Sequence, residues 1–305
     1  MIEVENLTKT YGRDKRPAVD DVSFRVNNGE ILGFAGLNGA GKTTTIEAIS
    51  GVIIPSGGSI LLDGLDIVKD KVNASKTVGW VSEFPTFEMN AKPLQLIQYY
   101  AGFYDFSTAE SRRIGTRLLK EVGLENAVNR KLRDYSQGMK KRFGLAAAMI
   151  SDPGNYLLDE VLNGLDPEGV NYVRRSVQEF RKQGKSVLLS THILGVLEDI
   201  ADRIAIIHKG KLIKMLSKDG IKNLGKPVLE LRTNRIDDEL LRILGKYGNP
   251  TLRDDHILLS DIGDPDSTSQ EVSSAVMGGG YGLLHLNIVG ESLEEYFLQL
   301  IEGEA

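Results

Sequence analysis

The sequence predicts an α/β protein in which a mostly parallel sheet with covering helices precedes a smaller α+β unit. Short apolar or alternating runs, which are typical of strands, occur at residues 2–4, 22–26, 30–35, 156–158 and 186–190. A glycine-rich segment follows the run at 30–35 and leads into a predicted helix at 43–50. The later runs alternate with helical stretches, and this alternation indicates parallel strands buried under helices.

The chain is long enough for one large domain and a second, smaller one. It has 305 residues, with ordinary globular proportions of charged and hydrophobic residues. We expect the large domain at residues 1–217, with a helical subdomain at about 88–150, and a C-terminal accessory domain at 218–305. The pattern changes between about Lys209 and Gly225, where the turn at 209–211 and Asp219-Gly220 indicate a linker into the second domain.

The C-terminal domain is predicted to have a ferredoxin-like fold. Its expected strands lie at 228–233, 251–253, 257–260 and 282–288, with a turn at Asp254-Asp255, and its helices at 236–247, 268–277 and 292–301. The first six of these seven elements follow the order βαββαβ, which is the order of a ferredoxin-like module, and the last helix is an addition.

Composition narrows the class of protein. No window has the roughly 18 to 20 consecutive apolar residues that a membrane-spanning helix requires. The N-terminus begins with strand-like alternation instead of a signal peptide, so we expect a cytoplasmic protein. Cysteine is absent, which excludes disulfides and thiolate metal sites. The net charge of −5 gives no basic surface for nucleic acid or anionic lipid, so any membrane contact is expected to pass through a protein partner.

The glycine-rich segment fits the pattern of a phosphate loop. Its residues are Gly36, Leu37, Asn38, Gly39, Ala40, Gly41, Lys42 and Thr43, followed by Thr44. In such a loop backbone N–H groups face the phosphates, the lysine meets the terminal phosphates, and the Thr43 hydroxyl binds Mg²⁺. A glycine-rich turn or a dinucleotide fingerprint is the alternative, but neither requires Lys42-Thr43 at this position. The segment therefore predicts a site for a nucleotide with Mg²⁺.

Two acidic residues end a later buried strand and supply what hydrolysis of a phosphate bond requires. Asp159 is placed to reach Mg²⁺, and Glu160 is placed to act as general base. His192, after another buried strand, is a candidate to position the water and Glu160. Tyr11 is a candidate to stack on an adenine ring. Read alone, the acidic pair is a solvated strand end, His192 a structural residue and Tyr11 a packing residue.

The segment Tyr135-Ser136-Gln137-Gly138-Met139, before a long apolar helix, resembles the signature motif of the ABC ATPases. Ser136 and Gly138 are expected at a helix N-terminus, which is a natural anion site. The resemblance implies a phosphate-loop NTPase of ABC type, with a mixed sheet, an antiparallel β region and a helical subdomain. It also implies that Ser136, Gln137 and Gly138 face ATP held by a second subunit, in a homodimer with two ATP molecules sandwiched head to tail. Without it, Ser136 is simply a helix cap.

Two further positions correspond to elements of the family: Asp166 fits the family pattern, and Glu83 departs from it. Asp166, in Asn163-Gly164-Leu165-Asp166-Pro167, corresponds to a loop that crosses the dimer interface. Glu83 takes the place of a glutamine that in this family contacts Mg²⁺ and senses the transmembrane partner. Gln137 and Met139 replace the usual glycine and glutamine. These variants resemble the drug, antibiotic and lipid exporters, in which the permease is a separate chain and the ATPase is peripheral on the inner face of the membrane. The resemblance is specific as far as about Ser217.

Other features have competing interpretations. Residues 84–89 are expected to contact a permease, whereas the tyrosines at 99, 100 and 104 are expected to pack in the core. The charge runs at 112–113 and 140–142 are expected to be solvated helix faces. A soluble ABC ATPase of translation or DNA repair, and an importer ATPase, are the rival functions. For the C-terminal domain a dimer brace, a ligand sensor and a permease contact stay open.

Overall fold

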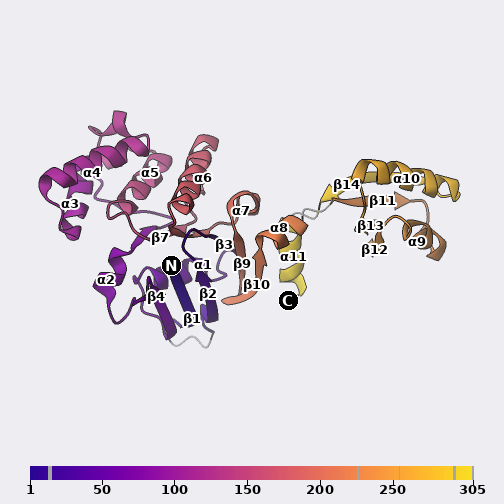
Figure 1. The fold of residues 1–305 in the computed structure, drawn as a ribbon, viewed down its shortest axis with the longest axis horizontal. Helices are drawn as coiled ribbons and strands as arrows, with labels where there is room; N and C mark the ends of the chain where they lie inside the picture. Colours follow the sequence, from indigo (N-terminus) through magenta and orange to yellow (C-terminus); the bar gives the residue numbers. More distant parts are fainter. Residues whose placement is uncertain (13–15, 225–226, 254, 291–292, 304–305) are drawn as a thin grey trace. The chain divides into compact units, whose positions relative to one another are not determined.

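The computed structural model describes residues 1–12, 16–224, 227–253, 255–290 and 293–303 (Figure 1). The chain divides into two compact units, Met1–Lys218 and Asp219–Ala305. The sequence places this division one residue earlier, after residue 217. No helix in the described ranges is long and apolar enough to cross a membrane.

An antiparallel sheet covers one side of the first unit. In spatial order its strands are β2 (Val19–Val26), β1 (Ile2–Lys9), β4 (Gly57–Leu62) and β5 (Leu65–Asp66). The residues of these strands alternate between buried and exposed, as in a sheet with one solvated face. The strands β4 and β5 are absent from the sequence prediction.

A six-stranded sheet forms the centre of the unit and carries the predicted site. In spatial order its strands are β10 (Lys211–Ser217), β9 (Arg203–His208), β3 (Ile31–Ala35), β8 (Ser186–Ser190), β7 (Asn155–Asp159) and β6 (Val78–Val81). All neighbours are parallel except β9 and β10. Every residue of β3, β7 and β8 is buried, which explains the short apolar run that each of these strands contains.

The turn at Lys209 and Gly210 closes a β-hairpin, so the prediction that it begins a linker is wrong. Both residues have positive φ, 48° and 83°, as the type I′ turn of a two-residue hairpin requires. The Gly210 N–H donates to the Ala40 carbonyl at 2.9 Å, and the Gly210 carbonyl accepts from the Asp20 N–H at 2.9 Å. The hairpin turn is thereby fixed to the glycine-rich segment. Gly225, at the end of the predicted linker, lies outside the described residues.

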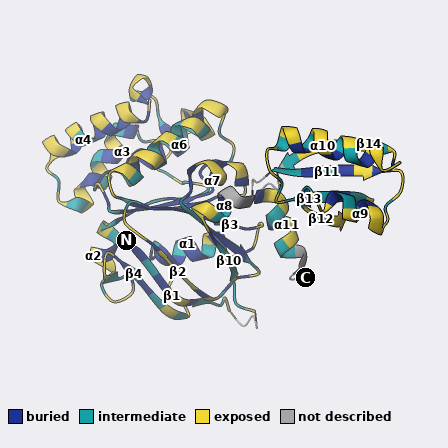
Figure 2. Ribbon diagram, turned by 45° about the vertical axis from the view of Figure 1, so that its right-hand side comes forward, coloured by how far each residue is buried: buried dark blue, intermediate teal, exposed yellow. Residues whose placement is uncertain are grey.

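Seven helices and three short 3₁₀ turns complete the described part of the first unit. The helices are α1 (Lys42–Ile49), α2 (Lys71–Lys76), α3 (Pro93–Ala101), α4 (Thr108–Glu121), α5 (Gln137–Ala148), α6 (Pro167–Lys182) and α7 (Leu194–Ile200), and the 3₁₀ turns are Gly102–Tyr104, Glu125–Ala127 and Leu132–Asp134. Helices α3, α4 and α5 gather away from β1, β2 and β4 (Figure 1) and share a core distinct from that of the sheets. They form the predicted helical subdomain. The helix α4 is buried along one side and exposed along the other (Figure 2).

The second unit has the ferredoxin-like arrangement that the sequence predicts. Its elements are α8 (Lys218–Leu224), β11 (Pro227–Thr233), α9 (Asp238–Leu244), β12 (Asn249–Arg253), β13 (His256–Ser260), α10 (Pro265–Gly278), β14 (Leu283–Gly290) and α11 (Leu293–Gly303). The sheet order is β12-β13-β11-β14, all antiparallel. Leu229, Leu231, Ile257 and Leu259 pack one sheet face with residues of α9 and α10. Asp254 of the predicted turn and Ser292 of the predicted last helix lie outside the described residues.

Candidate functional site

The glycine-rich segment wraps around the ammonium group of Lys42 between β3 and α1. Lys42 is buried, and its Nζ donates to the carbonyls of Gly36 at 2.7 Å and Leu37 at 3.2 Å. Gly41 has φ of 108°, and a Cβ there would lie 2.6 Å from the carbonyl oxygen of Ala18. Only glycine fits this position. The curved backbone and central lysine have the form of an anion cradle at a helix N-terminus.

A cavity of about 290 Å³ opens over this cradle and brings separate parts of the chain together. It is lined by Ala18, Asn38, Gly39, Gly41, Lys42, Thr43, Thr44, Glu83 and Glu160. Glu83, whose match to the family was the weakest, therefore lines the same cavity as the phosphate loop. Ala18 was not predicted, because nothing in its sequence neighbourhood marks it.

Asp159 lies fully buried at the end of β7. Its Oδ1 accepts a hydrogen bond of 2.6 Å from the Ser190 hydroxyl, and its Oδ2 has no hydrogen-bond partner among the described residues. Burial raises the pKa of Asp159, the nearby hydroxyls of Ser190 and Thr43 partly offset this effect, and the charges of Glu160 and Glu83 add to it. A buried carboxylate with a free oxygen and a raised pKa is the form expected of a group that meets a cation.

Glu160 lies between a lysine and a histidine. Its Oε1 is 3.2 Å from Lys42 Nζ, an ion pair without hydrogen-bond geometry, and its Oε2 is 3.1 Å from His192 Nδ1. The Glu160 side chain is buried, whereas that of His192 is 54% exposed. His192 therefore connects the carboxylate to solvent and limits its orientation. The predicted pairing of these two residues agrees with this geometry.

The residues predicted to bind Mg²⁺ suit a metal that is shared with phosphate oxygens. Within the residues that the structure describes, no group of three His, Cys, Asp or Glu side chains forms a metal site alone. Thr43, Glu83 and Asp159 nevertheless lie close enough for the first two to influence the pKa of the third. Mg²⁺ in phosphate sites takes one or two carboxylates together with substrate phosphates and water. The free oxygen of Asp159 fits that arrangement.

Two residues near the carboxylates escaped prediction. Ser190 meets Asp159 because β7 and β8 are neighbours with Asp159 opposite Ser190, a register visible only once the strand order is known. Glu47, on α1, has a raised pKa because of burial and the charge of Asp159. The site thus concentrates negative charge before any ligand is bound.

The raised pKa of Asp159 predicts a stability effect. The Asp159 carboxyl keeps its proton to higher pH in the folded state than in the unfolded state. The protonated carboxyl therefore contributes to stability at low pH, and this contribution is lost as pH rises through the raised pKa. Asp159→Asn should therefore raise the melting temperature of the nucleotide-free protein at neutral pH, and the gain should shrink as pH falls. Calorimetry in EDTA tests this, with exposed Glu179→Gln as control. A variant destabilised at every pH would contradict the prediction.

The signature residues lie apart from the phosphate cavity of their own chain. Ser136 is the N-cap of α5, and its side chain accepts from the Met139 N–H at 3.2 Å. Ser136 and Gln137 are exposed, and Gly138 is half-buried. The predicted helix N-terminus is therefore present and faces solvent. None of these three residues lines the cavity over the phosphate loop.

Asp166 and Tyr11 also lie outside that cavity. Asp166 caps α6, and its side chain accepts from the Gly169 N–H at 2.8 Å. Tyr11 is exposed, with the Lys9 ammonium 5.1 Å from its ring centre. The Tyr11 ring is thus accessible, and its stacking on an adenine ring stays a prediction.

The aromatic residues of the helical subdomain differ in part from expectation. Phe84 is 77% exposed, in line with a contact surface. Phe87 is partly buried and packs edge-on against Phe143 beside the subdomain core, with the ring centres 4.8 Å apart, and its contact with a permease stays a prediction. Tyr99 is exposed and meets exposed Phe103 edge-on, with ring centres 5.3 Å apart, although core packing is expected for Tyr99. Tyr100 and Tyr104 pack against the subdomain core, as expected. Local sequence does not reveal which side of a helix faces the core when aromatics are consecutive.

Lys141 corrects the interpretation of the charge run at 140–142. It is 8% exposed, whereas the run was expected to be a solvated helix face. Its Nζ donates to two backbone carbonyls near Glu160. A buried lysine is rare unless its charge has partners.

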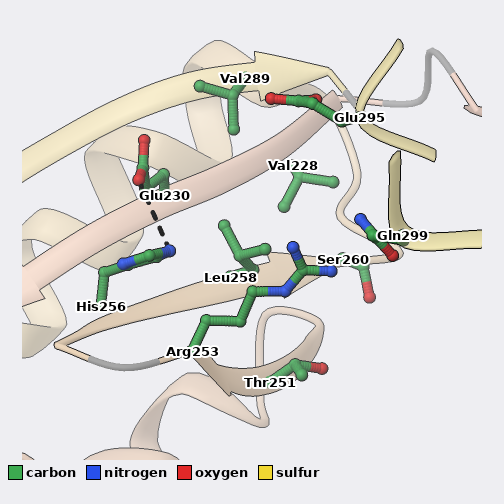
Figure 3. Close-up of a pocket in the computed structure, with 10 residues that line it drawn as sticks. All are labelled: Val228, Glu230, Thr251, Arg253, His256, Leu258, Ser260, Val289, Glu295 and Gln299. Carbon is green, nitrogen blue, oxygen red and sulfur yellow. Dashed lines mark ion pairs between the residues drawn. The ribbon is translucent and has the colours of Figure 1, made fainter. Parts of the chain in front are cut away.

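The accessory unit has a separate cavity of about 360 Å³ on the sheet face opposite α9 and α10, where Glu295 and Gln299 of α11 also line it (Figure 3). Val228, Leu258 and Val289 supply apolar surface, the Arg253 side chain points into it, and Glu230 pairs with His256 Nε2 at 3.8 Å. No glycine is among its described lining residues, so it has no counterpart of the phosphate loop. Its size is in the range of small-molecule sites, which is the property that a ligand sensor requires.

The fold and the phosphate site together define a phosphate-loop nucleoside triphosphatase, because a lysine-centred glycine loop joins a parallel strand to a helix beside a buried acidic pair. The family model of the ABC transporters matches residues 19–163. The bacitracin transport ATP-binding protein of Bacillus licheniformis is 30% identical over 99% of this chain and 98% of its own length. The chain therefore belongs to the ABC transporter family, as an ATP-binding protein.

Two further comparisons each cover about three quarters of this chain. The lantibiotic transport ATP-binding protein of Streptococcus pyogenes is 33% identical over 73% of this chain and 94% of its own length. A solved structure of an ATP-binding subunit of an ABC transporter is 30% identical, with a TM-score of 0.66, over 72% of this chain and 90% of its own. The bacitracin relative, by contrast, also aligns with the accessory unit.

Proposed function

We propose that this chain is the ATP-hydrolysing subunit that energises export by a separate transmembrane permease. The observation that carries the proposal is the position of the Glu160 carboxylate, between Lys42 Nζ at 3.2 Å and His192 Nδ1 at 3.1 Å, over the phosphate loop. A carboxylate there is placed to accept a proton from water that attacks the terminal phosphate.

Each residue of the site has a part in this reaction. Backbone N–H groups of residues 36–44 and the Lys42 ammonium hold the phosphates, and Tyr11 stacks on the adenine ring. Glu160 accepts the proton of the attacking water, and His192 orients Glu160. Thr43, Asp159 and Glu83 would hold Mg²⁺, which supplies positive charge to neutralise the phosphate oxygens.

The chain is proposed to work as a homodimer. Ser136 caps a twelve-residue helix with an exposed N-terminus, and none of its first residues lines the phosphate cavity of the same chain. A second subunit, arranged head to tail, would place its bound ATP against Ser136, Gln137 and Gly138, and Asp166 would reach toward the opposite site. Closure on ATP and opening after hydrolysis would then drive the permease.

Export is favoured by the relatives. Their names include bacitracin transport, lantibiotic transport and linearmycin resistance. Exposed Phe84, in the loop after β6 that also carries Glu83, offers an apolar contact for the permease. In this proposal the protein is cytoplasmic and meets the membrane only through that partner. Soluble ATPases of translation or repair and importer ATPases are the competing functions.

Purification with its partners tests the proposal. Tagged Glu160→Gln protein is purified with ATP from detergent-solubilised cells of its source, and the co-purifying proteins are identified by mass spectrometry. A stoichiometric multi-span membrane protein is expected. Recovery with ribosomes, with repair factors or with no partner would count against a transporter subunit.

A further inference from the structure

Lys141 connects the signature helix to the backbone beside Glu160. It lies on α5, five residues after the N-cap Ser136. Its Nζ donates to the carbonyl of Glu160 at 3.0 Å and to the carbonyl of Asn163 at 2.6 Å. The two acceptors belong to the turn that follows β7, so one buried ammonium fixes this turn to the helix.

The turn needs such a support because Glu160 has an uncommon backbone conformation. Its φ is 46°, in the left-handed region that a glutamate rarely adopts. The Glu160 carbonyl accepts from the Asn163 N–H at 3.2 Å as well as from Lys141, and the Glu160 N–H donates to the Ser190 hydroxyl at 3.0 Å. Strained conformations of this kind persist only where surrounding contacts hold them.

Glu83 belongs to the same network. Its Oε1 accepts from Asn163 Nδ2 at 3.5 Å. Burial lowers the pKa of Lys141, while the negative charges of Glu83 and Glu160 oppose that effect. The two carboxylates therefore offset part of the cost of burying the Lys141 ammonium, and Glu83 has a cationic neighbour.

We propose that Lys141 is a positioning residue for ATP hydrolysis, which holds the turn from Glu160 to Asn163 so that the Glu160 carboxylate faces the phosphate loop. This inference rests on the proposed function. Lys141 does not line the cavity over the phosphate loop and acts only through Glu160. Because α5 begins at Ser136, the helix that meets the second subunit's ATP also sets the base over its own.

The test compares Lys141→Met and Lys141→Arg, with exposed Lys120→Met on α4 as control. Steady-state ATPase assays give kcat and KM, and a fluorescent ATP analogue gives the nucleotide Kd. In Lys141→Met we expect kcat to fall by about 10- to 100-fold, the range seen when catalytic groups shift by about 1 Å. KM and Kd should stay within about two-fold because the phosphate loop is intact. Lys141→Arg should restore most of the turnover, since its guanidinium retains the donors.

Distinct outcomes separate this inference from the proposed function. Wild-type protein with no ATPase activity would overturn both. An active wild type with unchanged kcat in Lys141→Met would overturn the positioning role alone. Loss of melting temperature together with equal losses in kcat and nucleotide affinity, without rescue by arginine, would assign Lys141 a purely structural role. If Lys141→Met does not fold, Lys141→Ala also removes both donated hydrogen bonds, and wild-type turnover in it would overturn the inference.

Discussion

Replacing Glu160 by glutamine is expected to lower ATP turnover by about 10²–10⁴-fold, the usual contribution of a general base. Glutamine keeps the size of the side chain but cannot accept the proton of the attacking water. Nucleotide binding should persist, because the Lys42 ammonium and the backbone of residues 36–44 are unchanged. Lys42 also loses its ion pair with Glu160 at 3.2 Å, so its charge is more available to phosphate.

The same variant should accumulate as an ATP-bound dimer. Binding that continues without hydrolysis leaves the proposed sandwich closed. Light scattering after size exclusion, with and without saturating ATP, measures the dimer, and a phosphate-release assay measures turnover. Glu179→Gln, which removes an exposed carboxylate on α6, is the matched control and should behave as wild type. A Glu160→Gln protein that stays monomeric in ATP would count against the sandwich, and one with normal turnover would exclude Glu160 as the base.

Lys42→Ala is expected to lower nucleotide affinity by about 10- to 100-fold, since a hydrogen bond between charged groups contributes about 1.5–3 kcal/mol. The ammonium is the centre around which the loop is folded, and its bonds to the carbonyls of Gly36 and Leu37 would also be lost. The buried Glu160 carboxylate would lose its ion pair with this ammonium. A lower melting temperature is therefore expected as well.

Titration with a fluorescent nucleotide checks this prediction, and Lys120→Ala is its control. Together the two variants distinguish binding from chemistry, because Lys42→Ala should fail at the first step and Glu160→Gln only at the second. Wild-type affinity in Lys42→Ala would show that the cavity over residues 36–44 is not where the nucleotide phosphates bind.

The parts of the fold that could be predicted have strong local patterns. The strands β3, β7 and β8 are buried on both faces, so each contains a short apolar run. The ferredoxin-like order follows from clear alternation between Val228 and Ile288. The strand β4 begins with two glycines, which give no side-chain pattern, and β5 has two residues. Strands of that kind depend on their neighbours instead of their own sequence.

The candidate site also has residues that local sequence reveals and residues that only the tertiary structure brings together. The phosphate loop is contiguous, and the acidic pair and His192 end buried strands, so each could be found by position alone. Ser190 meets Asp159 across 31 residues of sequence, and Lys141 meets Glu160 across 19. Such contacts depend on strand order and on which side of a helix faces the sheet. A charge run such as 140–142 gives no sign that one of its members is buried.

The hairpin of β9 and β10 determines where the chain can be shortened. Its turn binds the phosphate loop through the Gly210 N–H and the Ala40 carbonyl, and β10 is the strand that leads into α8. A fragment that stopped at Gly210 would lose β10, which pairs with β9 and fixes that turn. A fragment that ended after Lys218 would keep the six-stranded sheet whole. The smallest piece of this protein that can hold its nucleotide is therefore set by the outer strand of the hairpin, some distance in sequence beyond the last residue of the site.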